Sequence, residues 1–336
     1  MTEYNVGGIY TLLDLLKYMD PSNSRLLFVA EVLSRKNPIV NEAPILEANQ
    51  ALTHIGTRDI ALPTVQKRAI NDGVPYSAHK EVQITAPMSL FETMSRVDEE
   101  ILRLAGANAA GVRQRKDAKF IEAMSQSLAD ELFYGSVADD VLGFNGFATL
   151  FKSSSVYPNN DSTWYYNVLL GGGAGSDTTS IWAMEWGPDK VHLIYPKGTM
   201  GGIEIDDLGK QLVSGITGST QYVAYVTQFK WRCGLFVADE RCVQRIANVE
   251  TAGASNTFDD DDLLTMCNRL PDMGENPNTK IYVNRTIRTQ MDIKVKDKNN
   301  VNYYADKDAF GKPVLYFRGI PVQVLDCITN TETVIT

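Results

Sequence analysis

The chain contains three histidines, His54, His79 and His192, and their positions limit the acid–base chemistry that it can perform. None stands beside a serine or cysteine in a nucleophile elbow such as G-x-S-x-G. His192 lies in the apolar run KVHLIYP, which is typical of a buried structural histidine. Catalytic partners can be distant in sequence, but the local motifs favour a protein that is not an enzyme.

The residue types that bind metals do not fall at metal-binding spacings. The cysteines form no C-x-x-C pair, so neither structural zinc nor a disulfide scaffold is expected; they are Cys233, Cys242, Cys267 and Cys327. The acidic run 259–262 lacks the alternating ligands, the turn glycine and the distal glutamate of a calcium loop. The helix dipole explains four acids in a first turn better, and we predict no metal site.

The glycine run 171–175 invites comparison with a phosphate-binding loop. Such a loop follows a strand and opens a helix, whereas this run precedes a strand and no Gly-Lys-Ser/Thr follows it. We therefore predict a flexible link here and no bound cofactor.

Two groups of basic side chains are candidates for contacts with other molecules. They are Lys67, Arg68, His79 and Lys80 in one stretch and Arg113, Arg115 and Lys116 in another. The ordinary interpretation of the second group is a solvated helix start; the alternative is contact with nucleic acid or an acidic neighbour. The net charge of -9 argues against a protein that coats nucleic acid, but not against a container for it.

The composition is that of a soluble protein, with 44% hydrophobic and 22% charged residues. No run approaches the roughly 18 apolar residues of a membrane span. The first residues lack the basic flank and apolar run of a secretory signal. We expect no membrane contact, and synthesis and assembly in the cytoplasm.

The clearest element is an amphipathic helix over 117–135, with an apolar stripe formed by Phe120, Ile121, Met124, Leu128 and Leu132. We predict that Asp117 caps its first turn, that Gly135 ends it in the left-handed conformation, and that an apolar start at Val112 lengthens it. An acidic loop, 137–142, and the sequence GFNGF follow.

Upstream, two apolar helical patches lie within residues 1–45, and 47–87 forms two extended pieces around the turn signal Asn71-Asp72-Gly73. Such a hairpin has little core of its own, so it must either be mobile or lie on something else, and a projecting arm of this kind fits an assembly better than a lone globule. Ser89 and Glu92 form a capping box that predicts a helix, with its apolar side formed by Phe91, Met94, Val97, Ile101 and Leu104.

Downstream, 152–161 is predicted to be a polar surface loop and 179–250 to be rich in strands, with two or three long antiparallel strands in 220–250. A short helix follows over 263–270, then a strand, 280–283, a helix that starts at 284–286 and a final strand pair with a turn at 319–321. The fold class is α+β.

Several blocks together resemble the major capsid proteins of short-tailed phages of the epsilon-15 type. They are YTLLDLLKYMDP, ALPTVQKRAINDGVP, DAKFIEAMSQSLADELFYG, SIWAMEWGPDKVHLIYPKG, FKWRCGLFVADERCVQRIANVE, YVNRTIRTQMDI and FRGIPVQVLD. They run in order through most of the chain, and their number carries the resemblance because none is diagnostic alone.

The resemblance implies a Hong Kong 97-type fold. Its parts map to an N-terminal arm, 1–46; an extended loop, 47–87; a peripheral domain, 88–255, with a spine helix, 112–134, and long strands, 220–250; and an axial domain, 256–336. In the parent arrangement the long peripheral strands come last, whereas here they precede the axial block. We therefore predict a permuted element order with the same layout, which a structure with 220–250 in the axial domain would refute.

The resemblance also implies function and partners. Copies would form hexamers and pentamers that close an icosahedral virion head around double-stranded DNA, without sequence-specific binding and in the host cytoplasm. The chain starts at the arm, so a separate scaffolding protein is expected, with a portal and a cementing or decorating protein. No Lys/Asn pair for a crosslink is identified, and the seven basic residues above become candidate intersubunit contacts. The alternatives are an encapsulin-like nanocompartment shell and a β-rich hydrolase.

Overall fold

The computed structural model describes residues 35, 37–152, 167–215, 220–253, 255–295, 303–307 and 313–335. The helical patches expected before residue 35 and most of the polar loop 152–161 lie outside these residues. The chain forms two compact units. The described residues of the first unit fall within 90–128, 200–215 and 220–232, and those of the second fall within 35–89, 129–199 and 233–335. No helix in the described ranges is long and apolar enough to cross a membrane.

The first unit is built on two long antiparallel strands and a long helix. β7 (Ile203–Ser214) pairs with β8 (Gln221–Val237) along its whole length, with a bulge between Asp207 and Gly209. α4 (Ala109–Tyr134) packs along β8, where the rings of Phe120 and Phe229 stack with centroids 6.0 Å apart. A small core forms where α3 (Glu99–Ala105) meets α4; it contains Val97, Ile101, Leu102, Ala105 and Val112.

The spine helix predicted over 112–134 is confirmed as α4, although its start differs from the expectation. Asp117 lies in the helix interior and does not cap it, because the helix begins at Ala109 directly after the 3₁₀ turn η1 (Gly106–Asn108). Gly106 adopts φ 52°, a conformation that glycine tolerates, and this turns the chain between α3 and α4.

Gly135 ends α4 for a reason other than the one expected. It is absent from the residues with positive φ, so it is not a left-handed cap. A Cβ at this position would instead lie 2.4 Å from the carbonyl oxygen of Phe144. The loop after the helix returns closely over Gly135, whose carbonyl accepts hydrogen bonds from the Gly146 N–H at 2.9 Å and the Thr149 hydroxyl at 2.6 Å. The position needs a glycine for space.

The helix predicted from the Ser89 capping box is wrong. Residues 80–98 form one strand, β3 (Lys80–Asp98), and helix α3 begins only at Glu99. The Ser89 hydroxyl donates 2.7 Å to the carbonyl of Leu142 and caps no helix. The apolar residues at helical spacing were misleading because pairing with other strands decides the conformation here.

The second unit contains a seven-stranded mixed sheet in the order β11-β12-β13-β10-β5-β9-β4. The strands are β4 (Val168–Leu170), β5 (Thr178–Glu185), β9 (Val243–Glu250), β10 (Thr279–Val283), β11 (Tyr303–Lys307), β12 (Pro313–Phe317) and β13 (Ile320–Val324). Helices α6 (Asp260–Arg269) and α7 (Arg285–Lys294) contribute Leu263, Met266, Ile287 and Met291 to its core. Asp259 and Asn284 cap these helices, which begin within the acidic run 259–262 and at the start predicted over 284–286.

The long-strand block expected over 220–250 divides between two sheets. β8 ends at Val237, the turn η2 (Glu240–Cys242) redirects the chain, and β9 pairs with β5 and β4. The two strands therefore do not form a hairpin with each other.

The glycine run 171–175 is not a free link. The N–H groups of Gly171 and Gly173 donate hydrogen bonds of 2.8 Å to the carbonyl oxygens of Ala247 and Asn248, respectively. A Cβ on Gly173 would lie 2.6 Å from the Asn248 carbonyl oxygen, so glycine permits this close approach to β9.

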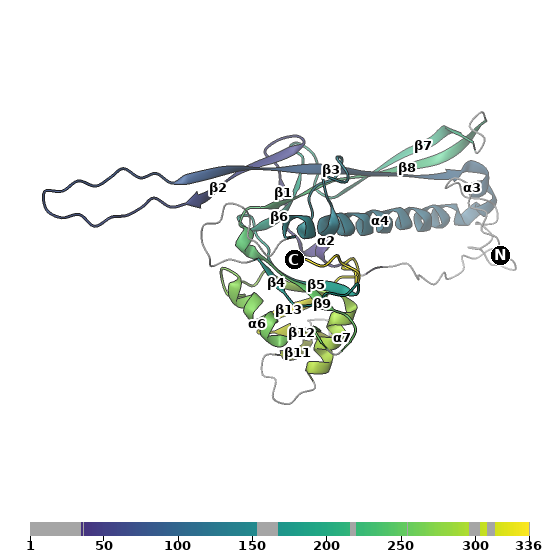
Figure 1. The fold of residues 1–336 in the computed structure, drawn as a ribbon. Helices are drawn as coiled ribbons and strands as arrows, with labels where there is room; N and C mark the ends of the chain where they lie inside the picture. Colours follow the sequence, from purple (N-terminus) through teal and green to yellow (C-terminus); the bar gives the residue numbers. More distant parts are fainter. Residues whose placement is uncertain are drawn as a thin grey trace. The chain divides into compact units, whose positions relative to one another are not determined.

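The second unit also contains β1 (Ile45–Glu47), β2 (Thr53–Ala61), β6 (Val191–Tyr195), the short helices α2 (Ile39–Glu42) and α5 (Phe147–Leu150), and the ends of β3 and β8 at 80–89 and 233–237. The strand order is β1-β6-β8-β3-β2. β2 and β3 form the expected hairpin, and their pairing stops at Ala61 and Lys80 (Figure 1).

Candidate interaction surfaces

Residues 62–79, the distal loop, leave the hairpin without further strand pairing and project from it (Figure 1). Every residue of this loop is exposed. The expected turn is present: Asn71 adopts φ 69°, and the Asp72 side chain accepts a hydrogen bond from the Gly73 N–H at 2.8 Å. The loop is thus a defined structure that has no core beneath it.

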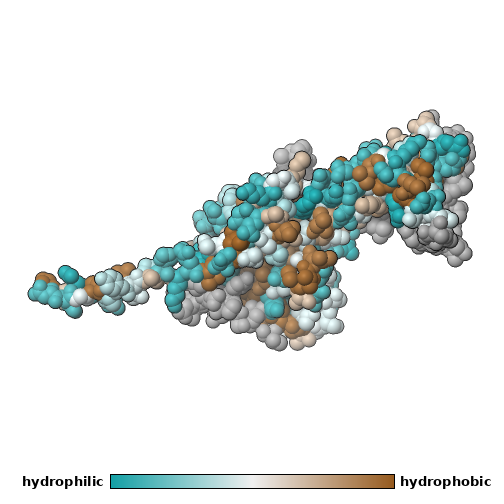
Figure 2. Space-filling model, turned by 90° about the horizontal axis from the view of Figure 1, so that it is seen from above, coloured by the Kyte–Doolittle hydropathy of each residue, from teal (hydrophilic) through white to brown (hydrophobic). Residues whose placement is uncertain are grey.

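Large apolar side chains of the distal loop face solvent. They are Leu62, Val65, Ile70, Val74 and Tyr76, and the exposed fractions of Val65 and Ile70 are 92% and 91%. Figure 2 shows brown side chains along this loop among hydrophilic ones. A projecting segment with so much exposed apolar area marks an interaction site.

The first group of predicted contact residues belongs to this part of the chain. Lys67 and Arg68 lie in the distal loop, and His79 and Lys80 lie where it rejoins β3; all four are exposed. The His79 Nε2 lies 2.6 Å from the Glu81 carboxylate.

The second group lies on α4 and is not the solvated helix start that the sequence suggested. Arg113 forms an ion pair with Asp207, donates 2.9 Å to the Thr227 hydroxyl, and lies 5.4 Å from the Tyr225 ring centroid. Arg115 is half-buried, and Lys116 is only 2% exposed. Sequence could not reveal the contacts of Arg113 because its partners Asp207 and Thr227 lie on strands that come much later in the chain.

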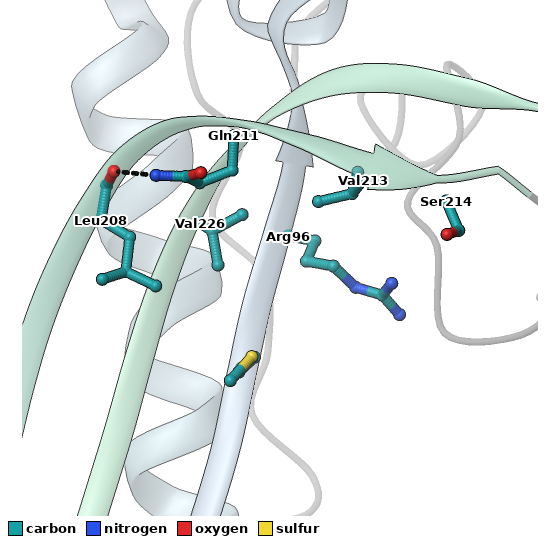
Figure 3. A pocket seen from close by; sticks show the side chains of 7 residues that line it. Arg96, Leu208, Gln211, Val213, Ser214 and Val226 are labelled. Carbon is teal, nitrogen blue, oxygen red and sulfur yellow. Dashed lines mark hydrogen bonds between the residues drawn. The ribbon is translucent and has the colours of Figure 1, made fainter.

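A trough on the exposed face of the first unit was missed by the sequence analysis. It has a volume of about 660 Å³ and is lined by Met94, Arg96, Leu208, Gln211, Val213, Ser214 and Val226. Figure 3 shows these side chains rising from β3, β7 and β8, with the Gln211 amide donating 2.9 Å to the Leu208 carbonyl. Brown side chains gather over the same strands in Figure 2.

The missed residues have a recognisable origin. Met94 had been assigned to the buried side of a helix, yet 48% of it is exposed on the strand. β7 was not predicted, although Ile203 and Ile205 alternate with polar residues at its start. The bulge at Gly209, with φ 68°, breaks that alternation before Leu212.

The four cysteines and His192 of the second unit have pKa values that burial shifts. Burial raises the pKa of Cys233, Cys242, Cys267 and Cys327 to about 12, so these free thiols stay protonated. Burial also lowers the pKa of His192, which is 4% exposed in β6, as its apolar run predicted. These pKa shifts are a consequence of burial in the packed interior of the unit.

Comparisons with known proteins agree over nearly the whole chain. The profile of the family described as major capsid protein GP7 matches residues 21–336. A chain in the structure of bacteriophage Epsilon15 shares 26% sequence identity with this chain and superposes with a TM-score of 0.70, and the match covers 97% of each chain. The bacteriophage JBD30 capsid is 13% identical with a TM-score of 0.52, over 92% of this chain and 99% of that one. The comparison with curated proteins found no match.

Proposed function

The chain belongs to the major capsid protein GP7 family, and we propose that its copies associate as hexamers and pentamers, through the distal loop, to close the head around double-stranded DNA. As a major capsid protein of a tailed phage, it forms the icosahedral head, is a component of the virion and is not an enzyme. The nanocompartment shell and the hydrolase are therefore set aside. The mixed α+β fold with its long spine helix matches Hong Kong 97-type capsids.

The observation that carries the self-association proposal is the exposed apolar side of the distal loop. Burying a large apolar side chain contributes about 1.5–3 kcal/mol, and the distal loop of each copy exposes five large apolar side chains. Each copy in a closed shell both offers this loop and receives one, so modest contacts add up around the shell.

The trough on the first unit is the proposed acceptor for the distal loop of a second copy. Its lining is largely apolar at Met94, Leu208 and Val226, which suits Leu62, Val65 and Ile70 of the loop. The carboxylates of Glu204 and Asp206 on β7 are paired with Arg232 and Lys230 of the same chain, and the charged side chain in the lining is Arg96. The apolar match therefore supports this occupant.

The seven basic residues do not contribute equally to this proposal. Lys67, Arg68 and Lys80 are exposed and can meet a neighbouring copy, whereas His79 is exposed but already contacts Glu81. Arg113 already binds Asp207 within its own chain, and Lys116 is buried. The proposed intersubunit role of Arg113, Arg115 and Lys116 is therefore secondary to that of the loop.

We keep the division into arm (1–46), extended loop (47–87), peripheral domain (88–255) and axial domain (256–336) as a proposal. The permuted order is likewise a proposal, supported by the position of β7 and β8 before α6, α7 and the last four strands. The permuted order is proposed for β8, 221–237, and not for the rest of the predicted block 220–250, because β9 pairs with β5 in the seven-stranded sheet.

The remaining partners are also proposals: a separate scaffolding protein, a portal and a cementing or decorating protein, with assembly in the host cytoplasm. An acidic chain tolerates enclosed DNA without binding it tightly, which suits a container. We propose non-covalent assembly, which a ladder of species on boiled denaturing gels would contradict.

Negative-stain electron microscopy of the protein expressed with and without its neighbouring genes tests this function. We expect closed shells or capsomers. A Leu208→Glu variant should lose them, because it places a charge in the proposed acceptor trough. A wild-type protein that stays monomeric at high concentration would contradict self-association, and shells from the Leu208→Glu variant would move the acceptor elsewhere.

A further inference from the structure

Three metal-ligating side chains come together where the distal loop rejoins the hairpin. Asp59 near the end of β2 lies directly opposite Glu81 in the strand register, and His79 is two residues before Glu81. Asp59 and Glu81 are opposite each other and so share a face, and the His79 Nε2 lies 2.6 Å from the Glu81 carboxylate on that face. One ligand atom from each lies within 4.8 Å of the other two.

The charges in this cluster need a partner. Asp59 and Glu81 are like charges directly opposite each other on an antiparallel pair, which is unfavourable. The neighbouring cation on β2, Arg58, is engaged elsewhere: its guanidinium donates to the carbonyls of Val237 and Ala238 and forms an ion pair with Glu240. His79 contacts Glu81 and places an imidazole nitrogen, a common metal ligand, beside the two carboxylates.

We propose that Asp59, His79 and Glu81 bind a divalent transition-metal ion, of which Zn²⁺ is the test case. One imidazole nitrogen and two carboxylate oxygens suit Zn²⁺ and its neighbours, whereas Mg²⁺ and Ca²⁺ prefer oxygen ligands alone. All three side chains are exposed, so water can complete the coordination. Ligand bonds of about 2.0–2.2 Å require only side-chain adjustment of an existing cluster.

The position of the site gives the ion a structural role. Strand pairing ends at Ala61 and Lys80, so the ion would join β2 to the last loop residue at the point where the hairpin opens. It would fix the base of the distal loop and therefore the direction in which the loop projects. This role requires no second copy and does not depend on the proposed function.

Isothermal titration of the untagged protein with ZnCl₂ tests the proposal directly. We expect one bound ion per chain, with MgCl₂ giving no comparable heat. Single variants Asp59→Asn, His79→Gln and Glu81→Gln should each weaken Zn²⁺ binding at least about tenfold, since loss of even an outer-shell partner has an effect of that size. Asp139→Asn, an exposed carboxylate distant in sequence, should bind as the wild type does.

Limited trypsin digestion tests the structural role in the same protein. Zn²⁺ should slow cleavage after Lys80, between two ligands, relative to cleavage after Lys67 in the loop, and Glu81→Gln should abolish this difference. No Zn²⁺ binding by the wild type, or equal binding by the three ligand variants, would overturn the site. If Zn²⁺ leaves the ratio of cleavage after Lys80 to cleavage after Lys67 unchanged, the structural role of the ion is wrong.

Discussion

The seven-stranded sheet and the distal loop differ in how they treat their side chains: the sheet buries them, and the loop exposes them to solvent. All eight residues of β5, at the middle of the sheet, are buried, including Thr178, Thr179, Ser180 and Glu185. The loop 62–79 buries nothing. The sheet buries its side chains within one chain, whereas in the proposed assembly another copy covers the loop, so we expect folding and assembly to depend on different residues.

The polar residues in the sheet depend on the C-terminal segment. The Thr178 and Thr179 hydroxyls donate 2.7 and 2.8 Å to the carbonyls of Glu332 and Thr329. The Glu332 carboxylate accepts from Arg245 at 2.8 Å and from the Tyr134 hydroxyl at 2.7 Å. Buried polar groups are stable only when they are paired, so this segment is required by the sheet.

The largest effect on folding is expected from Arg245→Ala. The side chains of Arg245 and Glu332 are 4% and 5% exposed, and the guanidinium also donates to Ser180 and the Phe151 carbonyl and lies 4.8 Å from the Trp182 ring centroid. Removing one partner leaves a buried carboxylate unpaired, which costs about 3–5 kcal/mol of unfolding free energy. Urea denaturation measures the loss.

Arg241→Ala is the matched control, since its partner Asp239 is a surface carboxylate on the same turn. We expect less than about 1 kcal/mol there. Equal losses of unfolding free energy for Arg241→Ala and Arg245→Ala would show that the buried network around Arg245 does not stabilise the sheet.

A smaller effect is expected from Gly135→Ala. The added Cβ would meet the Phe144 carbonyl oxygen at 2.4 Å, and backbone cannot yield as a flexible side chain does. Overpacking of this kind costs about 1–3 kcal/mol. Gly73→Ala in the distal loop meets nothing within 4 Å and should leave thermal unfolding nearly unchanged. Equal shifts at both positions would contradict the close return of the chain after α4.

The stability of the base of the β2–β3 hairpin, where His54 contacts β6, should depend on pH. His54 and His192 have ring centroids 6.2 Å apart beside Phe236, and burial lowers the pKa of both. The unfolded chain then binds more protons below about pH 6.5, so the stability present above that pH falls as the pH drops toward the folded-state pKa values. Unfolding of His192→Gln should show a weaker dependence between pH 7 and 5, and an identical dependence would contradict this.

The smallest effect on folding is expected in the distal loop. Val65→Asp with Ile70→Asp changes side chains that are 92% and 91% exposed, so the unfolding free energy should change by no more than about 0.5 kcal/mol per site. A loss as large as that of Arg245→Ala would mean that the loop is packed on its own chain.

The elements that were predictable carry their signals locally. α4 follows from its apolar stripe, α6 and α7 from the caps Asp259 and Asn284, and the loop tip from Asn71-Asp72-Gly73. Each depends on residues within a few positions of one another, so a single sequence contains the whole signal.

The failures arose where distant segments decide the structure. The apolar spacing in 89–104 fits a helix, but pairing makes its first part a strand. Arg113 looked solvated because its partners, Asp207 and Thr227, come much later in the chain. The acceptor trough draws on β3, β7 and β8 together, so no local pattern could have revealed it. Only the exposed loop residues among the candidate contacts were accessible to sequence reasoning.

The central claim is that the distal loop serves assembly and not folding. Negative-stain electron microscopy of the Val65→Asp, Ile70→Asp double variant beside the wild type, both checked for equal thermal stability, tests it most directly. We predict closed shells from the wild type and folded, unassembled protein from the variant. Shells formed by the variant as efficiently as by the wild type would contradict the claim.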